Sequence, residues 1–435
     1  MQLPLTDPDT LFEDLLQDLP TEVCLMAREF KGFVRAKKVK TPEQLLRLVL
    51  LYCGLDKSLR AVAGVFTARY EPITDQSIAE RLRACGPWVK ARLRRMLPLV
   101  PVAALAAGRR VLVLDASTVQ APGATGTDHR LPLCMDLVSL EFVEGLVTDV
   151  HSGETLKHFR LGSGDVAVAD RGYAHSQGLS AAVKQGAELI VRLNPFSVVL
   201  CTPTGQPLAL GAALKRQPAE TIRTLPVLIR SAGGQHEVRG WVHAYRLSAE
   251  QANRARQKCR QRHKTGQPQA EALWLAGWVL VFTTLAPAVL SAQTILAVYR
   301  CRWQIEIAIK RWKSVLDVDA LRAKACSPLA QVWLHGKLVY ALRLERRRRR
   351  TLGDRWGRLD HERVGTWWRV WGMLKEVIAP LITGALFWQE EVWEACLQVV
   401  AERPRRRKLQ KLPLAALALL YRHDASQQEE LPLAA

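Results

Sequence analysis

The sequence lacks the short motifs that mark several common enzyme and metal-protein classes. Its nine cysteines are scattered and none forms a Cys-x2-Cys pair, so a structural zinc site is not expected. There is no Gly-x4-Gly-Lys-Ser/Thr phosphate loop, no Gly-x-Ser-x-Gly elbow, and no His-x3-His pair among the ten histidines. These absences argue against P-loop, α/β-hydrolase and zinc-protease chemistry, and unpaired cysteines are typical of a reducing compartment.

Long apolar runs are also missing. The longest ones, residues 97–107 and 413–421, are too short to span a membrane. Residues 1–9 contain neither the basic region nor the apolar stretch of a signal peptide. We therefore expect a cytoplasmic protein with no membrane partner.

Negative charge is scarce. Lys and Arg number 62 against 41 Asp and Glu, which gives a formal net charge of +21 and a pI near 9.9. Such an excess predicts a polyanionic partner. With 435 residues, 49% of them hydrophobic, the chain can bury a large core and is too long for one ordinary domain.

Two aspartates follow short apolar runs. In residues 109–118 the apolar, partly β-branched stretch 111–114 precedes Asp115, and in residues 165–173 the apolar stretch 166–169 precedes Asp170. Each run is too short for a helix and predicts a buried strand that delivers an acid at its end. A lone Asp is more often a turn residue or a helix cap, so neither acid is informative by itself.

A third acid falls in a helical pattern. Tyr299, Arg302, Glu306 and Lys313 lie within an arc of roughly 60° on an ideal helix. An apolar stripe runs beside that arc and predicts one amphipathic helix packed on a core: Val298, Ile305, Ile309, Trp312 and Leu316. The alternative is an ordinary solvated helix face, with Glu306 and Lys310 as an i,i+4 ion pair.

The spacing Tyr299-x2-Arg302-x3-Glu306-x6-Lys313 resembles the signature of bacterial insertion-sequence transposases of the IS-four type, a group that includes the Tn-five transposase. The resemblance implies an α/β, RNase-H-like catalytic core with an Asp-Asp-Glu triad: Asp115, Asp170 and Glu306. Carboxylates are ligands that Mg2+ prefers, and Mn2+ substitutes for it, so the triad would hold two ions for phosphodiester cleavage and strand transfer.

The same resemblance implies contacts with double-stranded DNA around the triad. Arg302 and Lys313 would bind phosphates beside Lys310, and Tyr299 would donate a hydrogen bond to a phosphate. Family members that form hairpin ends place a tryptophan ahead of this helix, which here is Trp278. For Trp278 the alternative is a strand residue packed in the core.

The resemblance also implies a division of the chain. We expect a helical DNA-end-recognition domain over residues 1–100 and a first part of the core over 108–200, with strands at 142–150, 157–161 and 189–193. A β-rich insertion (201–272), a second core part (273–325) and a helical basic region (326–435) would follow. Residues 58–82 predict a helix-turn-helix whose second helix begins with Thr74, Gln76 and Ser77, although an ordinary helical pair fits equally well.

The C-terminal region contains two basic runs, residues 346–350 and 403–411, for which we favour nucleic-acid contact over a solvated face. The tryptophans of residues 367–371 are expected in a core. Two rival functions stay open: a non-catalytic transposase remnant that binds DNA as a repressor, and a metal nuclease without strand transfer. A homodimer on DNA is expected.

Overall fold

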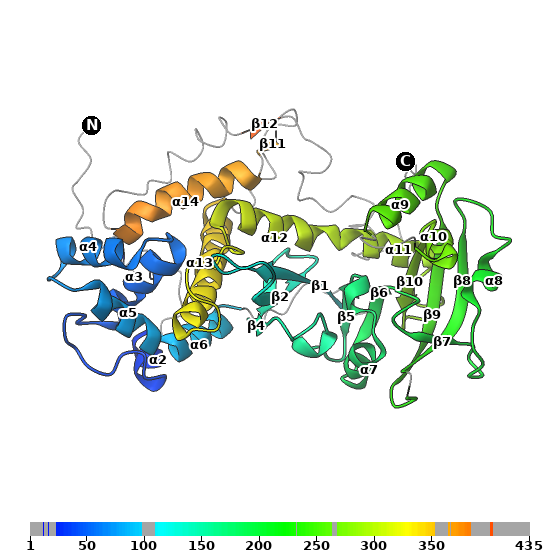
Figure 1. Ribbon diagram of the computed structural model, residues 1–435, viewed down its shortest axis with the longest axis horizontal. Helices are drawn as coiled ribbons and strands as arrows, with labels where there is room; N and C mark the ends of the chain where they lie inside the picture. The colour runs from blue at the N-terminus through cyan, green and yellow to red at the C-terminus, as the bar shows by residue number, and fades with distance from the viewer. Residues whose placement is uncertain are drawn as a thin grey trace, which may run out of the picture.

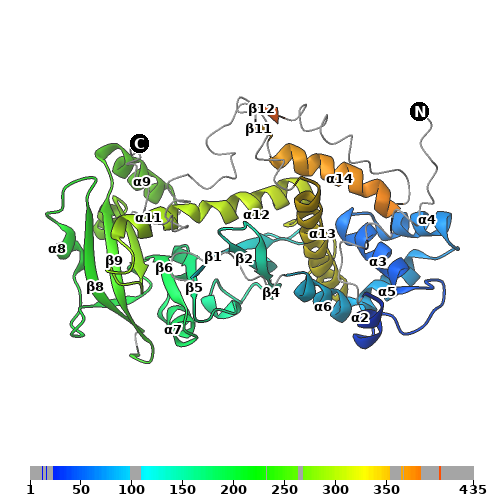
Figure 2. The ribbon, with the colours of Figure 1, turned by 180° about the vertical axis from the view of Figure 1, so that it is seen from behind.

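The computed structural model describes residues 12, 16, 23–97, 109–231, 233–262, 268–352, 364–365, 367–383 and 401–402. The molecule is elongated, with the N-terminal helices at one end and a broad sheet that extends to the other (Figure 1). Seen from behind, helices α12 to α14 again join the two ends (Figure 2). The predicted basic run at 403–411 and the apolar run at 97–107 fall outside the described residues, apart from Leu97.

The N-terminal part is helical, as expected. Helix α3 begins at Pro42 because the Thr41 side chain accepts a hydrogen bond from the Gln44 backbone N–H and proline suits the first helical turn. The elements are α2 (Val23–Glu29), α3 (Pro42–Val49), the π-helical η1 (Leu50–Gly54), α4 (Leu59–Arg69), α5 (Asp75–Ala84) and α6 (Gly86–Met96).

A mixed sheet forms the centre of the α/β fold. Strand β1 pairs antiparallel with β2 and parallel with β5, and β5 pairs parallel with β6, so the order begins β3-β2-β1-β5-β6. Helix α7 makes the crossover between the parallel strands β5 and β6. The bounds are β1 (Arg110–Val119), β2 (His129–Asp136), β3 (Phe142–Gly145), β4 (Thr148–Asp149), β5 (Asp165–Ala169), α7 (Ser176–Lys184) and β6 (Glu188–Arg192).

Two sequence-based predictions in this part are wrong. Residues 157–161 are not a strand, because residues 156–158 form the 3-10 turn η2 (Leu156–His158). Strand β2 was not expected, although it pairs with β1 along eight positions. Its sequence contains Pro132 and charged residues at both ends, which hides the apolar pattern of a strand.

The strands of the predicted insertion extend the same sheet. The order continues β6-β10-β9-β8-β7, with antiparallel pairing throughout. Strand β10, which leads back into the predicted second core part, begins at Trp278, after the short helix α10 that contains Trp274. The elements are β7 (Val199–Cys201), α8 (Leu210–Leu214), β8 (Ile222–Arg230), β9 (Glu237–Arg246), α9 (Ala249–Arg262), α10 (Ala270–Leu275) and β10 (Trp278–Thr283).

The remaining helices cover the sheet and join it to the N-terminal part. The 3-10 turn η3 (Arg171–Tyr173) follows β5, and α11 (Ala292–Cys301) and α12 (Trp303–Leu316) follow β10. Helix α13 (Pro328–Leu352) packs against α6 and η1, and α14 (Trp367–Thr383) packs against α12. The short strands β11 (Val364–Gly365) and β12 (Ala401–Glu402) pair with each other.

Alternating residues of β1 point into different cores. Val111 and Val113 belong to the large core that contains the N-terminal helices and α12 to α14. Leu112 and Leu114 belong to a second core with α7 and the distal strands. Because side chains alternate along a strand, Asp115 lies on the same face as Val113, the face that α12 covers.

Candidate active site

The register of the sheet brings Asp115 and Asp170 to neighbouring positions. The parallel pairing of β1 with β5 ends at the pair Leu114 and Ala169, and each aspartate is the next residue in its chain. Adjacent strands lie about 4.8 Å apart, so the two residues leave the paired region side by side. One expectation was wrong in detail, since Asp115 is not at the end of β1, which continues along β2 to Val119.

Helix α12 brings Glu306 to the same region. The predicted apolar stripe is confirmed: Val298, Ile305, Ile309, Trp312 and Leu316 are all buried. The predicted single helix, however, is two, because the chain turns at Arg302 between α11 and α12. With its stripe in the core, α12 contacts β1 and presents Glu306 in its first turn.

Arg302 connects two of the three acids. Its guanidinium forms an ion pair with Glu306 and lies 3.9 Å from an Asp115 carboxylate oxygen. Burial lowers the pKa of Arg302, but Tyr299, Glu306 and Asp115 outweigh it and raise the pKa overall. The arginine therefore stays charged and neutralises part of the acid cluster. Glu306 pairs with Arg302, whereas Lys310 lies over the Trp303 ring at 4.6 Å, so the solvated-face alternative does not describe this helix.

Asp115 has the most perturbed carboxyl group of the three. Burial raises its pKa to about 7; a hydrogen bond from the Ala116 N–H and the charge of Arg302 oppose the shift, and Asp170 and Glu306 add to it. The three predicted acids thus act on one another electrostatically, although they come from three separate elements. A carboxyl group shifted by burial together with charged neighbours is typical of functional sites.

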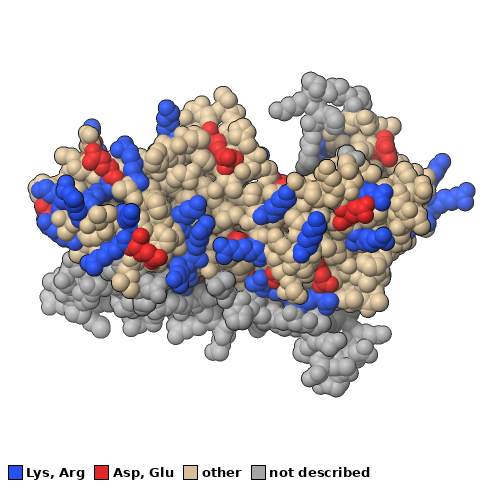
Figure 3. Space-filling model, turned by 90° about the horizontal axis from the view of Figure 1, so that it is seen from below, with Lys and Arg blue, Asp and Glu red and all other residues tan. Residues whose placement is uncertain are grey.

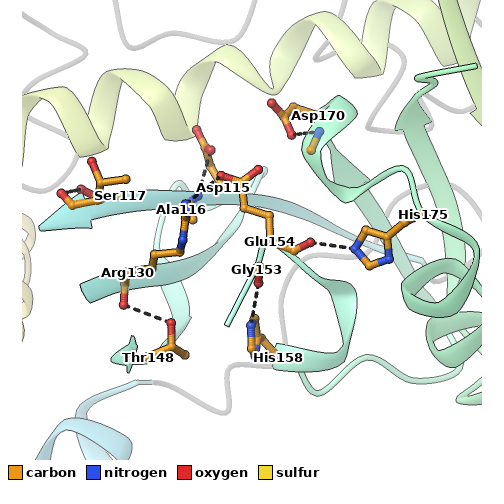
Figure 4. A network of polar contacts seen from close by, with 12 residues as sticks. Asp115, Ala116, Ser117, Arg130, Thr148, Gly153, Glu154, His158, Asp170 and His175 are labelled. Carbon is orange, nitrogen blue, oxygen red and sulfur yellow. Dashed lines mark hydrogen bonds and ion pairs between the residues drawn. The ribbon is translucent and has the colours of Figure 1, made fainter. Parts of the chain in front are cut away.

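Asp170 is held by the turn that follows it. Its side chain accepts a hydrogen bond from the Gly172 N–H at 2.8 Å and caps η3. A Cβ atom on Gly172 would lie 1.9 Å from a Glu154 carboxylate oxygen, so any other side chain here would have to push the end of the Glu154 side chain aside. Figure 4 shows Glu154 extending toward Asp115, with Asp170 on the other side.

Glu154 is an acid of this region that sequence reasoning missed. Burial raises its pKa, Asp170 raises it further, and Arg130, whose guanidinium lies 3.8 Å away, opposes both. Its backbone carbonyl accepts a hydrogen bond from His175 Nε2. Glu154 lies in a loop with no strand or helix pattern around it, so no local signal distinguishes it from a solvated loop acid.

The donor chemistry of the cluster fits a divalent cation. Its ligating atoms are carboxylate oxygens, which hard ions such as Mg2+ and Mn2+ prefer. The Tyr173 hydroxyl is buried without a hydrogen-bond partner, and its pKa is raised by burial and then by Asp115, Glu154 and Asp170. Within the described ranges, no three acidic, His or Cys side chains are close enough to hold an ion as they stand. Binding would therefore require these side chains, and Arg302 between them, to adjust.

The other predicted residues of this helix lie around the acids in different settings. Tyr299 is buried and its hydroxyl has no partner among the described residues. Lys313 lies farther along α12, where its ammonium is 3.7 Å from Asp319. Lys310 is exposed on the helix surface. Of these cations only Arg302 contacts the acid cluster.

The predicted helical pair is present as α4 and α5. Thr74 is the N-cap of α5: its hydroxyl accepts from the Ser77 N–H and donates to the Ser77 hydroxyl. Gln76 is exposed in the first turn. This arrangement leaves Gln76 free to contact a partner, while Thr74 and Ser77 already have a structural role.

Trp278 lies at the start of β10 and is only 5% exposed. The Arg246 guanidinium lies 5.8 Å from its ring centroid, and the Trp274 ring is 5.2 Å away. This burial favours the packing alternative for Trp278.

The C-terminal helices use some basic residues internally. Arg346 donates to the Met96 carbonyl and Arg348 pairs with Glu345, so part of the 346–350 run serves packing between α13 and its neighbours. Trp371 is fully buried, as expected, and Trp368 donates to the Ser314 hydroxyl. Basic side chains predominate over acidic ones on the face seen in Figure 3, which suits a polyanionic partner.

Comparison with known proteins identifies the class. Residues 106–342, more than half of the chain and all of the acid cluster, match the family described as "Transposase DDE domain". The chain therefore belongs to the DDE-domain transposases.

Individual proteins similar to this chain are also named as transposases. The chain is 29% identical over 335 residues to the transposase for insertion sequence element IS421 of Escherichia coli, covering 75% of this chain and 90% of that protein. It is 25% identical over 270 residues to the transposase for insertion sequence element IS231F of Bacillus thuringiensis subsp. israelensis, covering 53% of this chain and 55% of that protein. A solved piggyBac transposase complex with hairpin DNA aligns over 93% of this chain and 86% of its own at 9% identity, with a TM-score of 0.38, which is too low to support an inference.

No helix in the described part of the chain is both long and apolar enough to cross a bilayer.

Proposed function

We propose that this chain is a DNA transposase of the IS-four type that cleaves phosphodiester bonds at the ends of an insertion element and joins the cut strands to target DNA. The observation that carries the proposal is geometric: the register of β1 with β5 places Asp115 and Asp170 side by side, and the Arg302 guanidinium lies between Asp115 and Glu306. The relatives named as transposases of insertion sequences support the same assignment.

The proposal includes the finer fold. The strand order β3-β2-β1-β5-β6, antiparallel on one side of β1 and parallel on the other, supports an RNase-H-like core. Strands β7 to β9 and helices α8 to α10 would be the insertion between the second and third acids. In this arrangement the core places the acids, and the insertion enlarges the sheet beside them.

Asp115, Asp170 and Glu306 would hold two Mg2+ ions, with Mn2+ as a substitute. Bound divalent ions neutralise charge on the phosphate and activate the attacking oxygen for in-line displacement. Arg302 binds a phosphate by turning its guanidinium away from Asp115 and Glu306, and the guanidinium fork suits two phosphate oxygens.

Lys310 and Lys313 extend the phosphate contacts along α12, and the Tyr299 hydroxyl donates to a phosphate oxygen. Each of these contacts requires a change from the DNA-free structure, since Lys310 covers Trp303 and Lys313 faces Asp319. DNA binding would thus reorganise this face of the helix.

Recognition of the element ends is assigned to the α4–α5 pair, with Gln76 as the base-contacting side chain and Thr74 and Ser77 shaping the start of the helix. We further propose that the active form on DNA is a homodimer, one copy for each element end. Its site of action would be the bacterial cytoplasm, on nucleoid DNA.

Incubation of the full chain with DNA that carries its own element ends and Mg2+ tests the proposal. Cut ends that are then joined to a second DNA molecule are expected. Asp115→Asn, Asp170→Asn and Glu306→Gln should each abolish cleavage but keep end binding, because phosphate contacts dominate affinity. Glu271→Gln, on exposed α10, is the matched control.

The rival functions correspond to other outcomes of the same assay. End binding without any cleavage would indicate a DNA-binding remnant that acts as a repressor. Cleavage without joined products would indicate a metal nuclease. Cleavage by a triad variant at the wild-type rate would remove that residue from the active site.

A further inference from the structure

The acid cluster gathers several carboxylates in a partly buried region. They come from Asp115, Glu154, Asp170 and Glu306; Arg130 forms an ion pair with Glu154, and Arg302 forms ion pairs with Asp115 and Glu306. Like charges in a partly buried site repel strongly, so such a cluster favours a bound divalent cation.

Glu154 is the member of the cluster with the weakest protein contacts. Its nearest cation, Arg130, is 3.8 Å away, and no hydrogen bond to its carboxylate is present among the described residues. Other acids near the sheet have such bonds: Glu144, for example, accepts from the Arg160 N–H at 2.9 Å. A carboxylate that is 71% buried and lacks hydrogen bonds has open lone pairs.

The backbone is shaped to admit this carboxylate. A side chain at residue 172 would collide with Glu154, since a Cβ there would lie 1.9 Å from its Oε2 atom. The same Cβ position is 3.1 Å from an Asp170 carboxylate oxygen, so Gly172 lets the two acids approach each other across it. His175 holds the loop from the other side by donating to the Glu154 carbonyl.

A buried polar group faces the same acids. The Tyr173 hydroxyl is fully buried and has no partner in the described part of the chain. The charges that act on it most are those of Asp115, Glu154 and Asp170. A buried hydroxyl without a partner is costly, so the Tyr173 hydroxyl is available to donate a hydrogen bond to a ligand oxygen.

We propose that Glu154 is a further metal-binding residue of the active site, which shares a divalent cation with Asp115 and Asp170 while the Tyr173 hydroxyl donates to an oxygen of that ion's coordination sphere. The proposal rests on the proposed function for Asp115, Asp170 and Glu306. It adds a ligand from a loop that the three-acid pattern does not include.

Mn2+ binding to the full chain without DNA tests the proposal, with free Mn2+ followed by electron paramagnetic resonance. Glu154→Gln should weaken binding by about tenfold or more. Gly172→Ala is the second variant. It keeps all four acids, and its added methyl group would collide with the Glu154 carboxylate at 1.9 Å and meet an Asp170 oxygen at 3.1 Å, so it should weaken Mn2+ binding to a similar extent. The controls are Glu271→Gln and Gly64→Ala, whose added methyl group meets nothing within 4 Å.

The outcomes separate this inference from the proposed function. Suppose that wild type binds Mn2+ and that Asp115→Asn abolishes this binding. If Glu154→Gln and Gly172→Ala then each change the Mn2+ affinity by less than about twofold, Glu154 is not a ligand, while the proposed triad is retained. If the wild-type chain binds no Mn2+ and cuts no DNA, the proposed function itself fails. Melting curves identify any variant that has lost its fold, and in that case the other variant of the pair decides.

Discussion

The buried histidine of α13 predicts a measurable dependence of stability on pH. His335 is 5% exposed, and burial lowers its pKa from about 6.5 to about 4. The Lys90 and Arg94 charges of the neighbouring helix α6 lower it further, and a hydrogen bond to the Gln331 carbonyl opposes them. The folded protein therefore keeps this imidazole neutral where the unfolded chain would protonate it.

Proton linkage sets the direction in which the free energy of unfolding changes with pH. Between pH 6.5 and pH 4 the unfolded chain binds one more proton at His335 than the folded protein does, so acid favours unfolding. The stabilisation is complete above pH 6.5 and is lost as the pH falls toward 4. A shift of this size corresponds to about 3 kcal/mol in all, and about 2 kcal/mol of it is lost by pH 5.

Thermal melting of wild type and His335→Gln at pH 7.5 and pH 5 measures this contribution. For a chain of this length about 2 kcal/mol corresponds to roughly 2 °C, so the wild-type melting temperature should fall by that much more than the variant's. Glutamine keeps a donor for the Gln331 carbonyl but does not titrate. Equal drops in the two proteins would show that His335 is protonated in the folded state and that the burial argument is wrong.

Three further predictions concern DNA. Gln76→Ala in the full chain should leave the fold intact and reduce discrimination between element ends and scrambled duplex in gel shifts; unchanged discrimination would remove α5 from base recognition. Deletion of residues 403–435 should make the slope of log DNA affinity against log salt concentration less steep, because each phosphate contact contributes about 0.9 to the magnitude of that slope. An unchanged slope would mean that this basic run does not contact DNA phosphates. Trp278→Ala should lower stability by about 3–5 kcal/mol and reduce nicking and hairpin formation equally, whereas a selective loss of hairpins would revive the stacking role.

The setting of each predicted acid could be inferred from the sequence because each one follows or lies in a regular pattern. Asp115 and Asp170 follow apolar runs in the chain, and the parallel pairing of β1 with β5 then brings them together. Glu306 was predicted because the period of 3.6 residues fixed which face of α12 meets the core. The sequence pattern thus predicts which side of a helix is buried and which residues follow an apolar run.

Contacts that depend on pairing between distant segments could not be predicted in this way. Strand β2 exists because β1 has an open edge for it, while its own sequence is interrupted by Pro132. The break between α11 and α12 falls at Arg302, whose own φ and ψ angles are helical, so an ideal helix projection gives no sign of it. The continuation of the sheet through β10, β9 and β8 likewise reflects edge pairing, which local sequence does not encode.

Gly172 shows how the two kinds of information combine. In the sequence it is a turn glycine after Asp170, and a turn is sufficient reason for a glycine there. The structure gives a different reason. The φ angle of Gly172 is not positive, and the space beside its Cα is occupied by the side chain of Glu154, which lies in the loop after β4. The glycine therefore makes room for a neighbouring acid, while the local backbone places no demand on it. Residues 154 and 172 should then behave as a pair in mutagenesis: once Glu154→Ala has vacated this space, Gly172→Ala should cost little further stability.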